Sequence, residues 1–285
     1  MPTLYCQVSG GLANRLMSMI SSIRIARIMD YKFTLLWSHD ESITCNFNDV
    51  IRTTIPTISG RDVSISNIDI ASIENYNGRS AFTPPSHNRD LLVKGWHHIL
   101  LQQSDWLNFG DSGKIEAIEN EFRNIASELL WSDFDYIKNL RKTERKFDLG
   151  IHLRLNTKSD TRNWEVHGND FYLKTINYIS KKYNPKSLFI CTSNVELTKL
   201  IAEMLKSQIQ NITYFSNSDS GTGVDSIESA LEDMKQLSNC TRIFRNATST
   251  FSALPALLGA EAQIIFDDLG NLYETIPRLG SGAAL

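Results

Sequence analysis

The chain has 285 residues, of which 41% are hydrophobic and 21% charged, and neither Gly nor Pro is enriched. This composition excludes disordered, collagen-like and coiled-coil proteins and predicts a globular chain of one large or two modest domains. The 29 Lys and Arg residues against 32 Asp and Glu residues give a net charge of -3, which excludes a broad cationic surface for nucleic acid. Any anionic ligand must therefore be held by a local site.

Cysteine spacing and the N-terminus indicate a reduced compartment. The cysteines are far apart, and three of them stand in apolar or alternating runs that suit buried thiols: Cys6, Cys45, Cys191 and Cys240. No His/Cys cluster has the spacing of metal ligands, so we expect no metal site. The first residues lack a signal sequence, and no apolar stretch approaches the length of a membrane span. These features predict a cytoplasmic protein.

The N-terminal half begins with a strand, a Gly turn, a helix and a second strand. Residues 4–9 form a short apolar run, Gly10-Gly11 break it, apolar residues then recur at helical spacing to Ala26, and 32–37 supply the next strand. This pattern is a βαβ unit of a parallel sheet.

The middle of the chain is less regular. Residues 38–104 are rich in Ser, Thr, Asn and Asp, and only 91–94 is predicted as a strand. Residues 112–141 have a helical apolar period and predict one or two helices. We place a domain boundary at the basic run that ends at residue 146.

The second half alternates strands and helices strictly, which predicts a doubly wound parallel sheet with its ligand beyond the carboxyl ends of the strands. The expected fold class is α/β, with two facing domains over 1–146 and 147–279. Residues 280–285 are interpreted as a flexible tail. The predicted strands are 149–153, 188–192, 212–215, 242–244 and 263–266, and the helices are 170–183, 195–209, 226–238 and 249–259.

The first of three stretches that suit chemistry is Ser9–Leu16. Gly10 and Gly11 let a ligand approach the backbone, and the helix start offers unpaired N–H groups to an anion or a sugar. Asn14 and Arg15 follow as polar candidates for the same ligand. The pattern is neither GxGxxG nor a P-loop, so a simple tight turn is the alternative.

The second stretch is Gly150–Arg154, at the end of a predicted strand. His152 and Arg154 share one face there, and at the carboxyl end of a strand that face meets the ligand. Arg is suited to forked hydrogen bonds with phosphate oxygens. The alternative is a solvated Arg154 beside a half-buried His152.

The third stretch joins Asp233, on a predicted helix, to the segment 246–252 that opens the last helix. Successive hydroxyls at a helix start present N–H groups and form an anion cradle. The alternative is ordinary N-capping by Ser249 or Ser252, with Pro255 tolerated in the first turn.

Together these stretches resemble the fucosyltransferase superfamily that uses GDP-fucose, which includes bacterial α-1,2-, nodulation α-1,6- and protein O-fucosyltransferases. The shared residues are Asn14-Arg15 after the Gly turn, His152-x-Arg154, Asp233-Met-x-x-Leu-x-x-Cys240, and Ser249-Thr-Phe-Ser252. The resemblance implies two facing Rossmann-like domains of GT-B type: an acceptor-side domain over 1–146 and a nucleotide-sugar-binding domain over 147–279 that holds most of the donor. It also implies inversion at the anomeric carbon and no required metal or other cofactor.

The resemblance also implies roles for single residues. Arg154 corresponds to the arginine that binds the donor pyrophosphate, and His152 is its strand companion. Asp233 is similar to the acid near the nucleotide, and Ser249, Thr250 and Phe251 to the segment that cradles phosphate and base. Asn14 is similar to the asparagine of the Gly-rich loop.

The catalytic base is not fixed by these motifs, because the acid that many members carry close after His-x-Arg is displaced here. Candidates in the following loop are Asp160, Glu165, His167 and Asp170, of which Glu165 is slightly favoured. Asp133 and Asp135 could suggest a metal site, but their helical context favours a solvated helix face.

The predicted function is transfer of fucose from GDP-fucose to an oligosaccharide or polysaccharide acceptor, in polysaccharide biosynthesis. Two alternatives stay open. The same scaffold could use another nucleotide sugar, because the motifs contact phosphate more than sugar. The chain could also be a non-catalytic glycan- or nucleotide-binding protein, which would explain the displaced acid.

Overall fold

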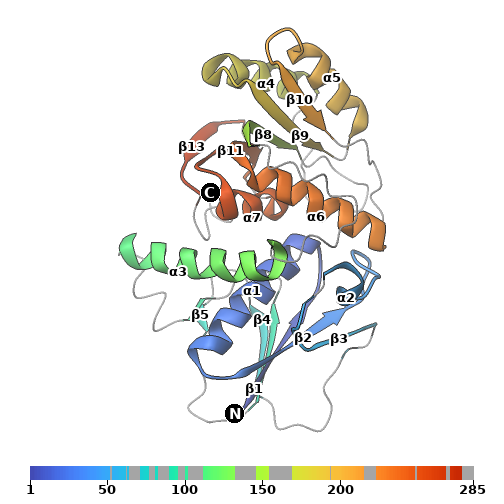
Figure 1. Ribbon diagram of the computed structural model, residues 1–285, viewed down its shortest axis with the longest axis vertical. Coiled ribbons are helices and arrows are strands. Elements are labelled where there is room, and N and C mark those ends of the chain that lie inside the picture. Colours follow the sequence, from blue (N-terminus) through green and yellow to red (C-terminus); the bar gives the residue numbers. More distant parts are fainter. Residues whose placement is uncertain are drawn as a thin grey trace. The chain divides into compact units, whose positions relative to one another are not determined.

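The computed structural model describes residues 1–51, 53–61, 63, 71–76, 81–82, 90–95, 100–101, 112–131, 146–153, 169–192, 194–214, 223–247, 249–267 and 270–277. Contacts within the chain divide it into two compact units (Figure 1). Unit 1 comprises 1–140 with 221–228, and unit 2 comprises 141–220 with 229–285. That residues 147–279 bind the nucleotide sugar stays a prediction. The predicted tail, 280–285, lies outside the described residues.

Unit 1 begins with the predicted βαβ unit. Strand β1 (Thr3–Val8) pairs in parallel with β2 (Lys32–Ser38), and helix α1 (Leu12–Ile28) connects them. Alternate residues of β1 are buried, and Cys6 Sγ lies 3.8 Å from the Ser18 carbonyl oxygen of α1. The buried alternate side chains of β1 therefore pack against buried residues of α1 in one core.

The sheet of unit 1 has the order β3-β2-β1-β6-β4, all parallel. The predicted strand 91–94 is β6, but the prediction of a single strand between 38 and 104 was wrong, because four further strands form there that are short or partly polar. The remaining elements are α2 (Phe47–Val50), β3 (Thr57–Gly60), β4 (Ala71–Tyr76), β5 (Ala81–Phe82), β6 (Leu91–Gly95), β7 (Leu100–Leu101), α3 (Ser112–Ala126) and a π-helical turn (Ser127–Trp131).

Unit 2 holds a six-stranded sheet in the order β10-β9-β8-β11-β12-β13. Counted along the chain this is 3-2-1-4-5-6, the doubly wound order, with its switch point between β8 and β11. The last strand is antiparallel to β12, so the expectation of a wholly parallel sheet was wrong at this edge. The strands are β8 (Phe147–Leu153), β9 (Ser187–Thr192), β10 (Asn211–Tyr214), β11 (Cys240–Asn246), β12 (Ala262–Phe266) and β13 (Leu272–Thr275).

Helices cover both faces of this sheet (Figure 1). Leu149, Ile151 and Leu153 of β8 share a buried apolar cluster with α4 (Asn169–Tyr183) and α5 (Val195–Leu205). The opposite face packs against α6 (Val224–Ser238) and α7 (Thr250–Gly259). The predicted α/β fold class is confirmed.

Two glycines let α6 and α7 approach closely. A Cβ on Gly150 would lie 2.7 Å from Cys240 Sγ and 3.2 Å from a methyl carbon of Leu237. A Cβ on Gly259 would lie 1.9 Å from the Ser238 carbonyl oxygen. Neither position has room for a side chain. Glycine at 150 therefore lets α6 pack closely on β8, and glycine at 259 lets the end of α7 pack closely on the end of α6.

Candidate active site

The switch point of unit 2 brings polar side chains of three strands into one row. His152 of β8 is in register with Cys191 of β9 on one side and with Arg245 of β11 on the other. All three are buried at the carboxyl ends of their strands, on the α6 and α7 face. This is where a doubly wound sheet binds its ligand, so the predicted position of His152 is consistent with a site role.

Asp233 extends this row from α6. Its carboxylate forms a hydrogen bond with the Cys191 thiol, which donates. Burial raises the pKa of Asp233 to about 7, and the pKa of Cys191 lies well above its ordinary value for the same reason. Asp233 is therefore an acid whose charge state changes near neutral pH, and Cys191 is a buried neutral thiol rather than a reactive one.

The start of α7 lies beside His152. The rings of His152 and Phe251 stack with centroids 5.1 Å apart and an interplanar angle of 20°. Ser249 occupies the N-cap position, but its side chain makes no capping hydrogen bond, and its Oγ is fully buried with no partner among the described residues. Thr250 is the first helical residue. The interpretation of Ser249 as an ordinary side-chain cap is therefore not supported.

Pro255 lies inside α7 rather than in its first turn, which corrects the expectation from the sequence. Proline has no N–H, so the Phe251 carbonyl loses its usual partner four residues later. The first turn of α7 consequently has fewer internal hydrogen bonds than an ordinary helix start.

Arg245 was not predicted as a site residue. Its side chain is fully buried, Nε donates to Gln263 Oε1 over 2.8 Å, and Nη1 donates to the Asn246 and Ala247 carbonyl oxygens over 3.0 and 3.2 Å. Burial lowers its pKa to about 10. The predicted strand stopped at residue 244, so this arginine was placed outside the sheet. Extending the strand by the observed two residues would have placed it beside His152.

The Gly turn of unit 1 is a second candidate for a ligand-binding element. Gly10 has a φ of 78°, which glycine adopts readily, and its N–H donates to Asp40 Oδ2 over 2.8 Å. Arg15 Nε donates to the Gly10 carbonyl over 2.6 Å, and its Nη2 lies 2.6 Å from Asp40 Oδ2. The guanidinium also lies 4.7 Å from the centre of the Trp37 ring. These contacts fix the turn.

Arg15 is fully buried, which differs from the expectation of a ligand-facing cation. Burial lowers its pKa and the Asp40 carboxylate opposes that shift. We infer that Arg15 stabilises the turn, so that any contact with ligand is made by the turn itself. Gly11 is exposed at the N-cap of α1, and Asn14 Oδ1 is buried without a partner among the described residues, so both stay candidates.

Several predicted residues lie outside the described part of the chain. These are Arg154, Asp160, Glu165, His167, Asp133 and Asp135. Asp170 is exposed near the start of α4. Within the described residues no three His, Cys, Asp or Glu side chains gather as metal ligands, and all four cysteines are buried free thiols. Metal independence stays a prediction.

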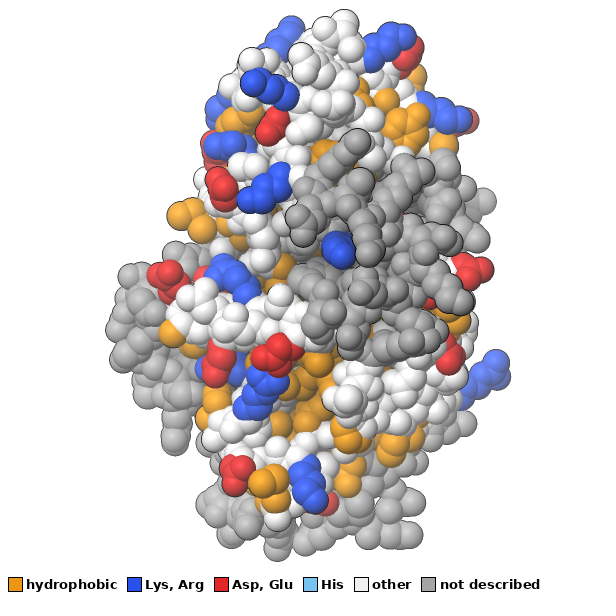
Figure 2. Space-filling model, in the orientation of Figure 1, with side chains coloured by type: hydrophobic (Ala, Val, Ile, Leu, Met, Phe, Trp, Pro, Cys, Tyr) orange, Lys and Arg blue, Asp and Glu red, His pale blue; other side chains and the backbone are white. Residues whose placement is uncertain are grey.

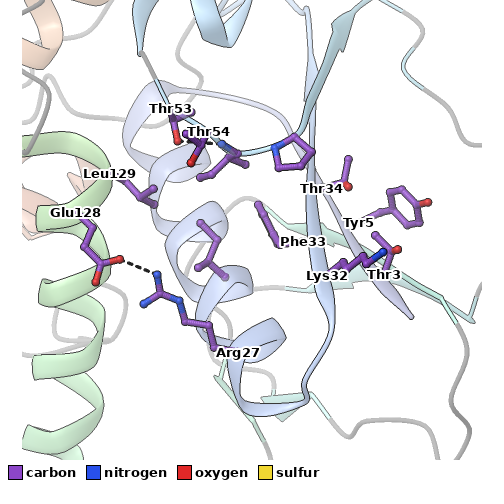
Figure 3. A pocket seen from close by; sticks show the side chains of 13 residues that line it. Thr3, Tyr5, Arg27, Lys32, Phe33, Thr34, Thr53, Thr54, Glu128 and Leu129 are labelled. Carbon is purple, nitrogen blue, oxygen red and sulfur yellow. Dashed lines mark hydrogen bonds and ion pairs between the residues drawn. The ribbon is translucent and has the colours of Figure 1, made fainter. Parts of the chain in front are cut away.

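A cavity of about 600 Å³ lies in unit 1 at the start of β1 and β2, opposite the Gly turn. Figure 3 shows Phe33, Leu129 and the Arg27–Glu128 ion pair on one side of β2, with Tyr5 and Thr34 on the other. The cavity is thus lined by side chains on both faces of the amino end of β2. Since ligands of such sheets bind at the carboxyl ends, we assign the site to the opposite edge.

The outer surface agrees with the charge balance of the sequence. On the face drawn in Figure 2, described Lys and Arg side chains are interspersed with Asp and Glu rather than gathered in one patch. Across the described residues, no helix combines the length and apolar character needed to cross a membrane.

No protein-family model and no curated protein matches the chain, but solved structures do. NodZ alpha-1,6-fucosyltransferase soaked with GDP-fucose matches with a TM-score of 0.63 and 14% identity, over 97% of this chain and 99% of that one. A mutant of Arabidopsis thaliana FUT1 in complex with GDP matches with a TM-score of 0.57 and 13% identity, over 93% and 70%. POFUT1 in complex with GDP-fucose matches with a TM-score of 0.50 and 13% identity, over 92% and 96%. The resemblance found in the motifs thus extends to the fold of nearly the whole chain.

Proposed function

We propose that this chain, which has the fold of GDP-fucose-dependent fucosyltransferases, transfers fucose from GDP-fucose to a glycan, with inversion and without a metal ion. The observation that carries the proposal is the polar set at the switch point of unit 2. There a helix start with an unpartnered buried Ser249 hydroxyl adjoins the His152–Phe251 stack. The oligosaccharide or polysaccharide nature of the acceptor and a cytoplasmic location are expectations from the sequence.

The nucleotide diphosphate is assigned to this set. The first N–H groups of α7 have no intrahelical partners, and the positive end of the helix dipole favours an anion there. Ser249, Thr250 and Phe251 supply this end of the helix. Asp233 and His152 border it from α6 and β8, and we assign them to the nucleotide. Gly10, Gly11 and Asn14 of unit 1 stay predicted ligand contacts from the sequence.

The reaction breaks the bond between the anomeric carbon and the β-phosphate oxygen, and that oxygen leaves with the bonding electron pair on GDP. The acceptor hydroxyl oxygen bonds to the same carbon from the opposite side, and its proton passes to a base. Negative charge grows on the pyrophosphate, so a fixed cation and oriented N–H donors stabilise the transition state. Arg154, directly after β8, and the start of α7 are assigned to this role, with Glu165 as base and Asp160 as the second candidate.

Binding tests the donor class first. GDP should raise the melting temperature more than UDP, CDP or ADP at equal concentration, because a ligand of the folded state stabilises it by about 2.7 kcal/mol at a hundred times Kd. GDP release from GDP-fucose should then rise on addition of a glycan acceptor panel. A larger shift with UDP would favour another nucleotide sugar. Tight GDP binding without release for any acceptor would favour a non-catalytic binding protein.

Chelation tests metal independence. With EDTA the rate of GDP release should stay near its untreated value, since side chains and backbone meet the charge of the leaving group. Loss of activity that Mg²⁺ or Mn²⁺ restores would instead assign a metal role to carboxylates such as Asp133 and Asp135.

A further inference from the structure

The guanidinium of Arg245 is buried without a counter-charge. Its side chain is 0% exposed, and the groups that accept its hydrogen bonds are the neutral Gln263 amide and two backbone carbonyls. Within the described part of the chain no carboxylate pairs with it, and its Nη2 has no hydrogen-bond partner. A buried charge is costly unless it is paired, and the described residues supply no charge that pairs with this cation.

This cation lies directly before the start of α7. The Asn246 and Ala247 carbonyls that Arg245 holds belong to the turn leading into the helix, and Ser249 follows with its own buried, unpartnered Oγ. The helix has ten residues and no acidic residue in its first turn. A buried positive charge, the positive end of a helix dipole and a hydroxyl without a partner among the described residues therefore all belong to the short segment from Arg245 to the first turn of α7, and each of them favours an anion.

We propose that Arg245 is a positioning residue that completes a phosphate site at the start of α7, and that the diphosphate of the bound nucleotide is its missing counter-charge. The two carbonyl hydrogen bonds orient the turn, and the fixed charge acts through a buried environment where screening is weak. This inference rests on the proposed function for the identity of the nucleotide, GDP.

Gln263 offers a direct test, because Gln263→Glu changes the partner of Arg245 Nε into a carboxylate of nearly the same shape. The new ion pair supplies the counter-charge from within the protein. We expect the melting temperature to stay equal or rise while the Kd for GDP increases at least about tenfold, because the added negative charge opposes binding of the diphosphate. Guanosine, which carries no phosphate, should bind the variant and the wild type equally.

Gln208→Glu is the matched control. Gln208 is exposed in the turn after α5, at the amino edge of the sheet, so the change alters net charge by the same amount away from the site. Its GDP affinity should remain that of the wild type. Unchanged GDP binding in Gln263→Glu, or a parallel loss of stability and of guanosine binding, would overturn the role of Arg245.

A second pair of variants covers the case in which Gln263→Glu does not fold. Arg245→Lys keeps the charge and Arg245→Met removes it, so GDP should bind at least about fivefold more weakly to the Met variant than to the Lys variant. Equal binding by the two would contradict the proposal.

Inorganic pyrophosphate separates this inference from the proposed function. If the wild type binds pyrophosphate but does not prefer GDP over other nucleoside diphosphates, and Gln263→Glu weakens that binding, the phosphate site stands and the GDP-fucose assignment fails. If GDP binds selectively and Gln263→Glu has no effect, the function stands and the role of Arg245 fails.

Discussion

Each unit has a buried arginine near the carboxyl ends of its parallel strands: Arg15 in the first turn of α1, and Arg245 near the end of β11. The groups around the two guanidinium groups differ. Arg15 has the Asp40 carboxylate, the Trp37 ring and the Gly10 carbonyl around its guanidinium. Arg245 has neutral acceptors and a terminal nitrogen without a partner among the described residues. Arg15 therefore has a counter-charge without a ligand, whereas Arg245 has none among the described residues.

This difference distinguishes structural from functional polar groups. A complete network stabilises its own backbone, here the turn at Gly10, and gains nothing from an added anion. An incomplete network keeps an energetic cost in the free protein that a bound anion can relieve. We therefore infer that the nucleotide phosphate binds in unit 2, next to Arg245 and Ser249.

The largest expected effect comes from making Arg15 resemble Arg245. Asp40→Ala removes the counter-charge and leaves the Gly10 N–H without its acceptor. Removing one partner of such a pair should lower the free energy of unfolding by about 3 kcal/mol, measured in urea. Asp170→Ala, at an exposed acid, should cost less than about 0.5 kcal/mol. Similar values for both would contradict a stabilising network around Arg15.

Arg154→Lys tests the cation expected to touch the phosphate itself. Lysine keeps the charge but loses the fork of two hydrogen bonds, so kcat for GDP release should fall by about 100-fold, while the circular dichroism spectrum stays that of the wild type. A kcat near the wild-type value would remove Arg154 from the mechanism and favour the non-catalytic alternative.

Asp233→Asn tests the buried acid of unit 2 through pH. Asp233 takes up its proton near pH 7 when folded and near its ordinary pKa of 3.8 when unfolded, so its favourable contribution is full below pH 3.8 and lost as pH rises through 7. At pH 8 the variant should be more stable than the wild type by on the order of 2 kcal/mol, because only the wild type then carries a charge at this partly buried position. At pH 4 this difference in stability should vanish, because Asp233 is then protonated in the folded protein.

Urea unfolding at both pH values measures this effect. Asp225→Asn, at an exposed acid near the start of the same helix, is the matched control and should leave the wild-type pH dependence unchanged. If Asp233→Asn retains the full wild-type slope, Asp233 is not the group that titrates near pH 7.

The smallest effect is expected from Ser249→Ala, because the described part of the chain offers this hydroxyl no hydrogen-bond partner. Stability should stay within about 0.5 kcal/mol of the wild type, while GDP affinity should fall about fivefold through one lost hydrogen bond to phosphate. Ser180→Ala removes another buried, unpartnered hydroxyl, on α4 at the opposite face, and should change neither quantity. Equal GDP affinity in both variants would exclude Ser249 from the phosphate site.

Much of unit 2 could be predicted from sequence because its central strands β8, β9, β11 and β12 are mostly buried and read as apolar runs. The predicted strands and helices of the second half correspond to β8 through β12 and α4 through α7. Strand β13 was missed because its residues, Leu272–Thr275, are all exposed and carry no apolar run. Strand β4 was missed for a similar reason, because its sequence ASIENY contains three polar residues and no apolar run.

The candidate site was predicted in part. Motifs name His152, Asp233 and Ser249 as candidates, whose roles stay predictions, and the sheet order brings His152 to the switch point. Arg245 and Gln263 were missed because the local sequence does not show that these polar side chains are buried, and only the pairing of β11 with β12 brings them together. Arg15 was read as a ligand contact because a motif does not reveal that Asp40, 25 positions later, neutralises it.

Backbone hydrogen exchange with and without GDP tests the central claim most directly. In the free protein the N–H groups of Thr250, Phe251 and Ser252 lie in the first turn of α7, where no intrahelical acceptor is available. If the diphosphate binds there, exchange at these three positions should slow when GDP is added, and exchange in β1 and around Arg27 should be unchanged. Slowing confined to unit 1, with no change at the start of α7, would contradict the assignment of the nucleotide to unit 2.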